Sequence, residues 1–80
     1  MRIIIVVDAY AFTPYKLQQA KMSFEELWHD VQEHPEKYQV GNHRPAQVLF
    51  VDQDFSPPNG TLAIASDDNG QPYVWKSRVD

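Results

Sequence analysis

The first clear pattern in the sequence is a run of five β-branched apolar residues, Ile3 to Val7, followed by Asp8. The run is too short for a typical helix and is apolar at every position, so it predicts a strand that is buried on both faces. A second apolar run, Val48 to Val51, lies within the segment from Ala46 to Asp52 and predicts another strand of this kind. A sheet that contains two such strands needs other parts of the protein, or another chain, to pack on both of its faces.

A helix is predicted from the sequence Ser23-Phe24-Glu25-Glu26, which matches a capping box. In this motif the Ser23 hydroxyl accepts a hydrogen bond from the amide of Glu26, while the Glu26 carboxylate accepts one from the amide of Ser23. Apolar residues then recur at the helical period and form one stripe, which consists of Phe24, Leu27, Trp28 and Val31. Because Pro35 disfavours a helical conformation at the residue before it, we expect this amphipathic helix to end near Glu33.

The segment from Pro14 to Lys21 permits two interpretations. Thr13 can cap a short helix that begins at Pro14, and this is the interpretation we favour. Tyr15 and Leu17 are also spaced as alternating residues of a strand would be.

A β-hairpin is predicted near the end of the sequence. The segments Thr61 to Ser66 and Pro72 to Arg78 flank Asp67-Asp68-Asn69-Gly70-Gln71, and Asn-Gly favours a two-residue type I′ turn. Such a turn sets the register of the two strands, and we expect the cross-strand pairs Ile64–Trp75, Ser66–Tyr73, Ala65–Val74 and Ala63–Lys76. Residues 53–60, before the hairpin, are rich in Pro, Asn and Ser and are expected to form a loop.

These elements predict a single α+β domain that spans residues 1–80. We expect a small three- or four-stranded, largely antiparallel sheet, in the order β-α-β-β-β along the chain, with one main amphipathic helix packed on a face. A helix of about eleven residues is only some 16 Å long, so it covers one face of the sheet at most. The other face needs either a second helix at Pro14–Lys21 or another protein chain, and the sequence leaves both open.

Composition narrows the classes of function. The chain carries a net charge of −4 and has no cysteine. The acidity disfavours direct binding to nucleic acid or to an anionic membrane surface, and the lack of cysteine excludes disulfides and thiolate zinc sites. The apolar run at residues 3–7 is shorter than the roughly 7–15 residues of a secretory signal, and no stretch approaches a membrane span, so we expect a cytoplasmic protein.

Candidate catalytic groups are few. Asp8 follows one apolar strand, and Asp52 and Asp54 follow the other, so these carboxylates would share a divalent cation if the two strands were parallel and adjacent. The three histidines lack the spacing of a zinc pair on a helix, and we expect them at the surface. We find no nucleophile turn and no phosphate-binding loop. We therefore expect no catalytic residue, no metal site and no cofactor.

Two groups of residues are candidates for contact with a protein partner. An acidic helix face can mimic a phosphate backbone, a device of small acidic proteins that inhibit DNA-handling enzymes. Aromatic side chains on the hairpin and on the loop before it can anchor an interface. The candidates are Glu25, Glu26, Asp30, Glu33, Phe55, Tyr73 and Trp75.

The function that these patterns favour is non-enzymatic protein binding, as an inhibitor or regulator of a larger protein such as one that handles nucleic acid. Short length, acidity and a lack of catalytic motifs are typical of small accessory proteins of the phage type. A minimal metal-dependent hydrolase that uses Asp8, Asp52 and Asp54 is the first alternative, and a structural subunit of a homo-oligomer is the second. We expect a protein partner or a second copy to contact apolar residues of the sheet.

Overall fold

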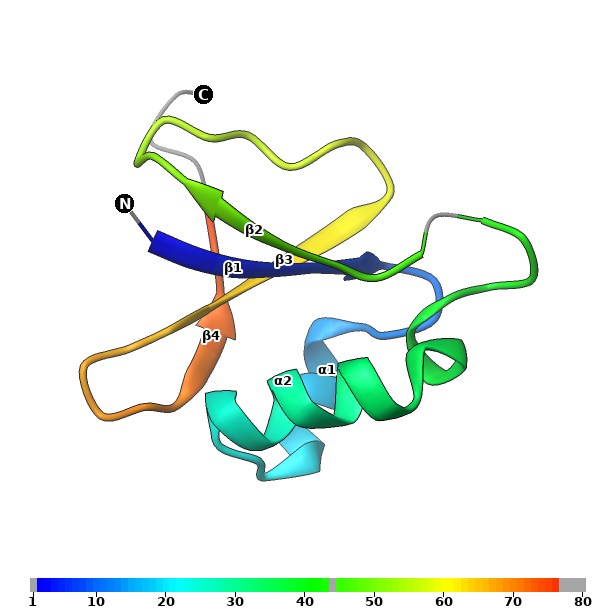
Figure 1. Ribbon diagram of the computed structural model, residues 1–80, viewed down its shortest axis with the longest axis horizontal. Coiled ribbons are helices and arrows are strands. Elements are labelled where there is room, and N and C mark those ends of the chain that lie inside the picture. The colour runs from blue at the N-terminus through cyan, green and yellow to red at the C-terminus, as the bar shows by residue number, and fades with distance from the viewer. Residues whose placement is uncertain (1, 44, 77–80) are drawn as a thin grey trace.

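The computed structural model describes residues 2–43 and 45–76, which form a four-stranded sheet with helices packed on one face (Figure 1). The sheet has the order β2-β1-β3-β4, and each neighbouring pair of strands is antiparallel. The α+β class and the antiparallel sheet are therefore confirmed. The elements are β1 (Arg2–Asp8), α1 (Pro14–Ala20), α2 (Phe24–Glu33), the 3₁₀ helix η1 (Pro35–Tyr38), β2 (Gln47–Val51), β3 (Thr61–Ser66) and β4 (Pro72–Val74).

The apolar run at the start of the chain forms the central part of the sheet. Strand β1 pairs with β2 on one side and with β3 on the other. Its residues Ile4 and Ile5 point to opposite faces and are both fully buried. Neighbours on both edges and apolar contacts on both faces explain why residues 4–7 of this run are all apolar, whereas Ile3 at its start is exposed.

The segment that permitted two interpretations is a helix, α1. The side chain of Thr13 caps it by accepting a hydrogen bond from the amide of Lys16 at 3.2 Å, and the helix ends where Lys21 adopts a left-handed conformation (φ 52°). The capping box of α2 is also present. The Ser23 hydroxyl and the Glu26 carboxylate each accept a hydrogen bond from the other residue's amide, at 3.1 Å in both cases.

The two helices cover the same face of the sheet. Leu17 of α1 and Leu27 of α2 pack in one buried cluster with Ile5 and Ile64 of the two central strands. Tyr38 of η1 extends this cluster and is 2% exposed. Helix α1 is therefore a second cover on the face that α2 already occupies, rather than the cover for the opposite face.

The opposite face holds a second, smaller core, which the chain forms with its own side chains rather than with the helix predicted at Pro14–Lys21. Ile4 and Val6 of β1 pack there with Ala63 and Ala65 of β3, beneath the indole of Trp75, and these side chains are at most 8% exposed. Leu49, Phe55 and Tyr73 pack around them. The small alanine side chains leave room for one large aromatic ring, so the sheet covers this face with its own side chains.

The hairpin register differs by one residue from the predicted one. Tyr73 lies opposite Ala65 and Val74 opposite Ile64, in place of the pairs Ser66–Tyr73 and Ile64–Trp75. The connection is a five-residue turn, because the carboxylate of Asp67 accepts hydrogen bonds from the amides of Asn69 and Gln71 at 2.9 and 2.8 Å. This shift places Tyr73 and Trp75 on the face away from the helices. Strand β4 ends at Val74, and residues 77 and 78 of the predicted strand lie outside the described residues.

Candidate interaction surface

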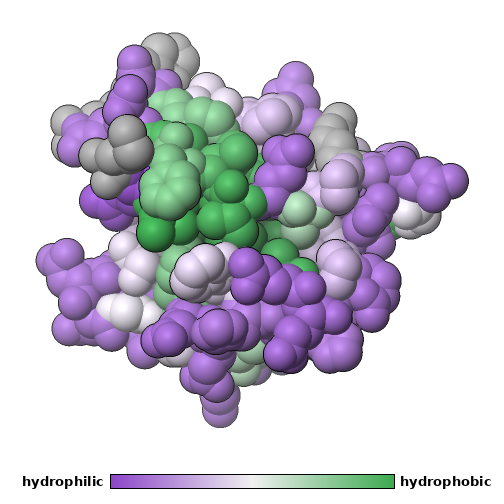
Figure 2. Space-filling view, in the orientation of Figure 1, coloured by the Kyte–Doolittle hydropathy of each residue, from purple (hydrophilic) through white to green (hydrophobic). Residues whose placement is uncertain are grey.

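Strand β2 forms one edge of the sheet and carries exposed apolar side chains. Phe50 lies opposite Ile3 of β1, and the two residues are 68% and 37% exposed. Val48 and Leu49 are half-buried beside them. Figure 2 shows a hydrophobic area over β2 and the adjoining part of β1, with hydrophilic surface along part of its border. We call these four residues, Ile3, Val48, Leu49 and Phe50, the β2 patch.

The hydrogen bonds of the sheet establish which backbone groups of β2 face outward. The amide of Trp75 donates to the carbonyl of Ala63, and the amide of Ala9 donates to the carbonyl of Gly60. Successive residues of an antiparallel strand direct their backbone N–H and C=O groups to opposite edges. Ala9 and Gly60 continue the pairing of β1 with β3, so the odd-numbered residues of β1 bond to β3 and the even-numbered ones bond to β2. The residues of β2 opposite these even-numbered positions are Gln47, Leu49 and Val51. Val48 and Phe50 therefore present their N–H and C=O groups to the open edge.

The four acidic residues of α2 that the sequence suggested for partner contact differ in how accessible their carboxylates are. Glu25 and Glu33 are exposed. Glu26 is also exposed, but its carboxylate is used in the capping box. Asp30 is the least accessible of the four, with a side chain that is 18% exposed, because the ammonium group of Lys37 donates to it at 2.9 Å and the hydroxyl of Tyr38 also donates to it. Asp30 thus connects α2 to η1.

These contacts change the titration of Asp30 and Tyr38. The hydrogen bonds from Tyr38 and Lys37 hold the pKa of the Asp30 carboxyl below its usual value of 3.8. Burial, together with the neighbouring carboxylate, raises the pKa of Tyr38 above its usual range. Both shifts favour an ionised Asp30 that accepts from a neutral Tyr38.

We expect the Asp30 contacts to make the protein less stable in acid. A carboxyl group whose pKa is lowered by folding contributes stability at neutral pH, and this contribution is lost as the pH falls through the folded-state pKa. Asp30→Asn should therefore lower the urea midpoint at about pH 7 and should flatten its decrease below about pH 4. Glu33→Gln, on the same helix, serves as the control. An acid dependence as steep in Asp30→Asn as in the native protein would contradict this role.

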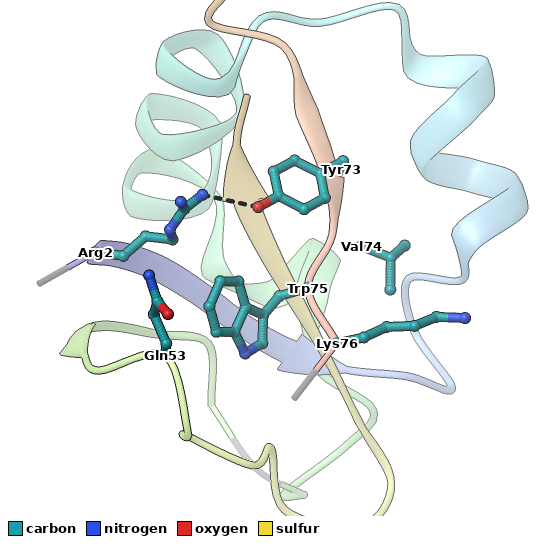
Figure 3. A pocket seen from close by; sticks show the side chains of 6 residues that line it. All are labelled: Arg2, Gln53, Tyr73, Val74, Trp75 and Lys76. Carbon is teal, nitrogen blue, oxygen red and sulfur yellow. Dashed lines mark hydrogen bonds between the residues drawn. The ribbon is translucent and has the colours of Figure 1, made fainter. Parts of the chain in front are cut away.

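The predicted aromatic residues lie together on the face away from the helices. The hydroxyl of Tyr73 accepts a hydrogen bond from the guanidinium of Arg2 at 2.8 Å, and the same guanidinium lies 5.3 Å from the centre of the Trp75 ring (Figure 3). These residues line an open hollow of about 350 Å³ with Gln53, Val74 and Lys76. The Trp75 indole N–H donates to the carbonyl of Phe55 at 3.3 Å, which ties the loop after β2 to this face. Trp75 is therefore mainly a core residue, and Tyr73 is the more accessible of the two.

Asp8 and Asp52 do not meet, because β1 and β2 are antiparallel. Asp8 lies opposite Thr61 at one end of β1, whereas Asp52 follows Val51, which lies opposite Arg2 at the other end. Six residue steps along a strand separate these ends by about 20 Å. The premise of the hydrolase alternative, that these carboxylates converge on one cation, is therefore wrong.

Asp8 has a different partner that the sequence did not indicate. Its side chain is fully buried, with one oxygen accepting from the amide of Tyr10 at 2.9 Å and the other lying 3.2 Å from Nδ1 of His43. The side chain of His43 is 59% exposed, so it faces solvent as expected of a surface histidine. This pair attaches the loop before β2 to the end of β1.

Metal-ligand chemistry is sparse in the part of the chain that the structure describes. Among residues 2–43 and 45–76, no three His, Cys, Asp or Glu side chains gather closely enough to hold a metal ion. Within the same residues, none of the helices has the length and apolar character needed to cross a membrane.

Comparison with models of protein families, with curated proteins and with solved structures finds no match to this chain. Its function must therefore be inferred from its own residues.

Sequence reasoning identified β2 as apolar but not as an exposed edge. Ile3, Val48 and Phe50 were assigned to buried strand faces, because the apolar runs carry no signal that distinguishes a central strand from an edge strand. The distinguishing fact is the pairing of β1 with both β2 and β3, which joins residues far apart in the chain.

Proposed function

We propose that this protein is a small non-enzymatic protein-binding module, and that the β2 patch is its main contact surface. The observation that carries this proposal is the exposed cross-strand pair of Ile3 and Phe50 on an open sheet edge. Burying a Phe or Ile side chain contributes roughly 1.5–3 kcal/mol, so a partner that covers this pair gains substantial free energy. Contiguous apolar surface with a polar rim is typical of protein interfaces.

The backbone supports the same proposal. Within residues 2–43 and 45–76, no strand pairs with the outward N–H and C=O groups of Val48 and Phe50. Such groups beside exposed apolar side chains suit a partner that adds a strand to the sheet. Natural proteins usually protect such an edge with charged residues, prolines or bulges. Strand β2 contains no charged residue and no proline, which supports a role for the edge in binding.

In this proposal the module acts in the cytoplasm as an inhibitor or regulator of a larger protein, such as one that handles nucleic acid. Glu25 and Glu33 are exposed on α2, and their charge would influence the association rate more than the affinity. Asp8 and His43 have a structural role, because both oxygens of the buried carboxylate already have partners in the fold.

Site-specific photocrosslinking tests the proposal directly. With p-benzoylphenylalanine in place of Phe50, irradiation of cells that produce the protein should give a discrete protein adduct. The same group in place of Tyr15, which is 66% exposed on α1, should give none, because α1 lies outside the β2 patch. Val48→Lys should abolish the adduct at position 50, since a charge on the edge disfavours strand addition. A lack of adducts at position 50, or equal adducts at both positions, would refute the proposal.

A further inference from the structure

We propose that the β2 patch binds a second copy of this chain, so that two β2 strands pair antiparallel and the two sheets join into one. This inference rests on the proposed function, because it takes the β2 patch as a protein-binding surface and names a second copy, in place of a larger protein, as the occupant. The described sheet has four strands with β2 at its edge, so the joined sheet would have eight. A two-fold symmetric contact of this kind uses one surface twice and needs no other protein.

The outward backbone groups fit this pairing. Val48 and Phe50 present their N–H and C=O groups to the open edge, as the alternation of bonds in the sheet requires. If the two-fold axis passes beside Leu49, Val48 of one copy lies opposite Phe50 of the second copy, and the reverse pair forms at the same time. Each pair exchanges two hydrogen bonds, so both outward residues of each strand gain partners.

The side chains of β2 are self-complementary in this register. Val48 and Phe50 project from the helix-covered face, where each aromatic ring would pack against a valine of the second copy. Leu49 projects from the other face and would lie beside its own symmetry mate. The apolar contacts therefore continue across the junction on both faces of the joined sheet.

Charge favours a second copy over a partner of opposite charge. Strand β2 has no charged side chain, so two identical strands meet without repulsion between like charges, and a basic partner finds no carboxylate on the strand. Each copy nevertheless carries a net charge of −4, which opposes association over longer distances. Added salt screens this repulsion, so salt should strengthen the dimer, whereas it would weaken a complex with a basic protein.

The size of the contact predicts a weak dimer. Strand β2 has five residues, far fewer than the roughly 20–30 residues per partner of a standard stable interface. We therefore expect a dissociation constant in the micromolar range.

Sedimentation equilibrium between about 1 µM and 1 mM protein should show a monomer–dimer equilibrium that shifts toward the dimer with added salt. Phe50→Lys should weaken the dimer at least about tenfold, while Tyr15→Lys on α1 should leave it unchanged.

Cysteine crosslinking tests the register, because the chain has no native cysteine. Residues of a pair that is not hydrogen-bonded have Cα atoms about 4.5 Å apart, which is within the range of a disulfide. Leu49→Cys should therefore form a covalent dimer rapidly under mild oxidation, and Tyr15→Cys should not. Circular dichroism of Phe50→Lys and Leu49→Cys should match that of the native protein, which shows that both variants are folded. If either variant is unfolded, the sedimentation of the native protein still tests whether the chain forms a dimer.

The outcomes separate this inference from the proposed function. A native protein that remains monomeric over the whole concentration range would overturn the dimer, as would a Leu49→Cys variant that crosslinks no faster than Tyr15→Cys. If the photocrosslinker at position 50 then captures a different protein, the binding function stands and the second copy is the wrong occupant. If it captures nothing, both proposals fall.

Discussion

Replacing Trp75 with alanine should lower the free energy of unfolding by about 3–5 kcal/mol, the usual cost of removing a buried aromatic side chain. Trp75 is 8% exposed and covers Ile4, Val6 and Ala65 on the face away from the helices. Its loss would open a cavity over a second core that has few other large side chains. Domains of this size have small total stability, so most molecules of this variant should be unfolded at 37 °C.

The measurement is urea denaturation followed by far-UV circular dichroism, because the substitution also changes the tryptophan fluorescence. Trp75→Phe is the matched variant, since it retains an apolar ring but loses the hydrogen bond to the carbonyl of Phe55, and its effect should be much smaller. Unchanged stability in Trp75→Ala would show that the indole is not a core residue. Trp75 would then regain the role of interface anchor that the sequence predicted.

The second large effect is expected at Asp8, where alanine should cost about 1–3 kcal/mol. The carboxylate is fully buried and serves two partners, the amide of Tyr10 and the ring of His43. Alanine would leave the Tyr10 amide without its acceptor and would release the loop that contains His43.

Two matched variants separate the contributions of these partners. Asp8→Asn can still accept from Tyr10 and should be less destabilised than Asp8→Ala, while His43→Ala should have the smallest effect because the imidazole is mostly exposed. Thermal unfolding at neutral pH ranks the three. If His43→Ala is as destabilising as Asp8→Ala, the stabilisation comes from the histidine contact, and the turn at Tyr10 contributes little.

The local elements were predictable from the sequence because their signals are local. The capping box at Ser23 requires a set of residues only four positions long, and the structure contains both of its hydrogen bonds. The apolar run at Ile3–Val7 identified β1 to within one residue at each end, as Arg2–Asp8. A helix was one of two interpretations of the segment Pro14–Lys21, and the Thr13 cap that favoured the helix is present in α1.

The arrangement of these elements was not predictable, because it depends on contacts between distant residues. The hairpin was assigned one residue out of register, since Asn69-Gly70 gives the same signal for a two-residue turn as for the wider turn that the Asp67 carboxylate stabilises. That single shift moved Trp75 to the face away from the helices, where it covers the second core. The pairing of Asp8 with His43 spans 35 positions and has no sequence signature.

The surface proposed from the structure differs from the one proposed from the sequence. The sequence suggested a contact over a whole apolar face of the sheet, whereas the structure exposes apolar side chains mainly at the β2 edge, with Phe50 68% exposed. Of the three aromatic residues chosen from the sequence, Trp75 is buried in the second core, and Phe55 and Tyr73 are half-buried against it. An apolar residue on an edge strand and one on a central strand look alike in a single sequence, and only the strand order distinguishes them.

The central position of β1 has a consequence for synthesis of the chain. Strand β1 is made before both of its neighbours, and 38 residues separate Asp8 from Gln47, where β2 begins. At roughly 5–20 residues per second, the ribosome needs about 2–8 s to make this stretch. Throughout that interval the nascent chain exposes five consecutive β-branched residues, a window that is prone to aggregation. Helices α1 and α2 emerge meanwhile, and until β2 and β3 follow, shielding of Ile3–Val7 depends on these helices or on a chaperone.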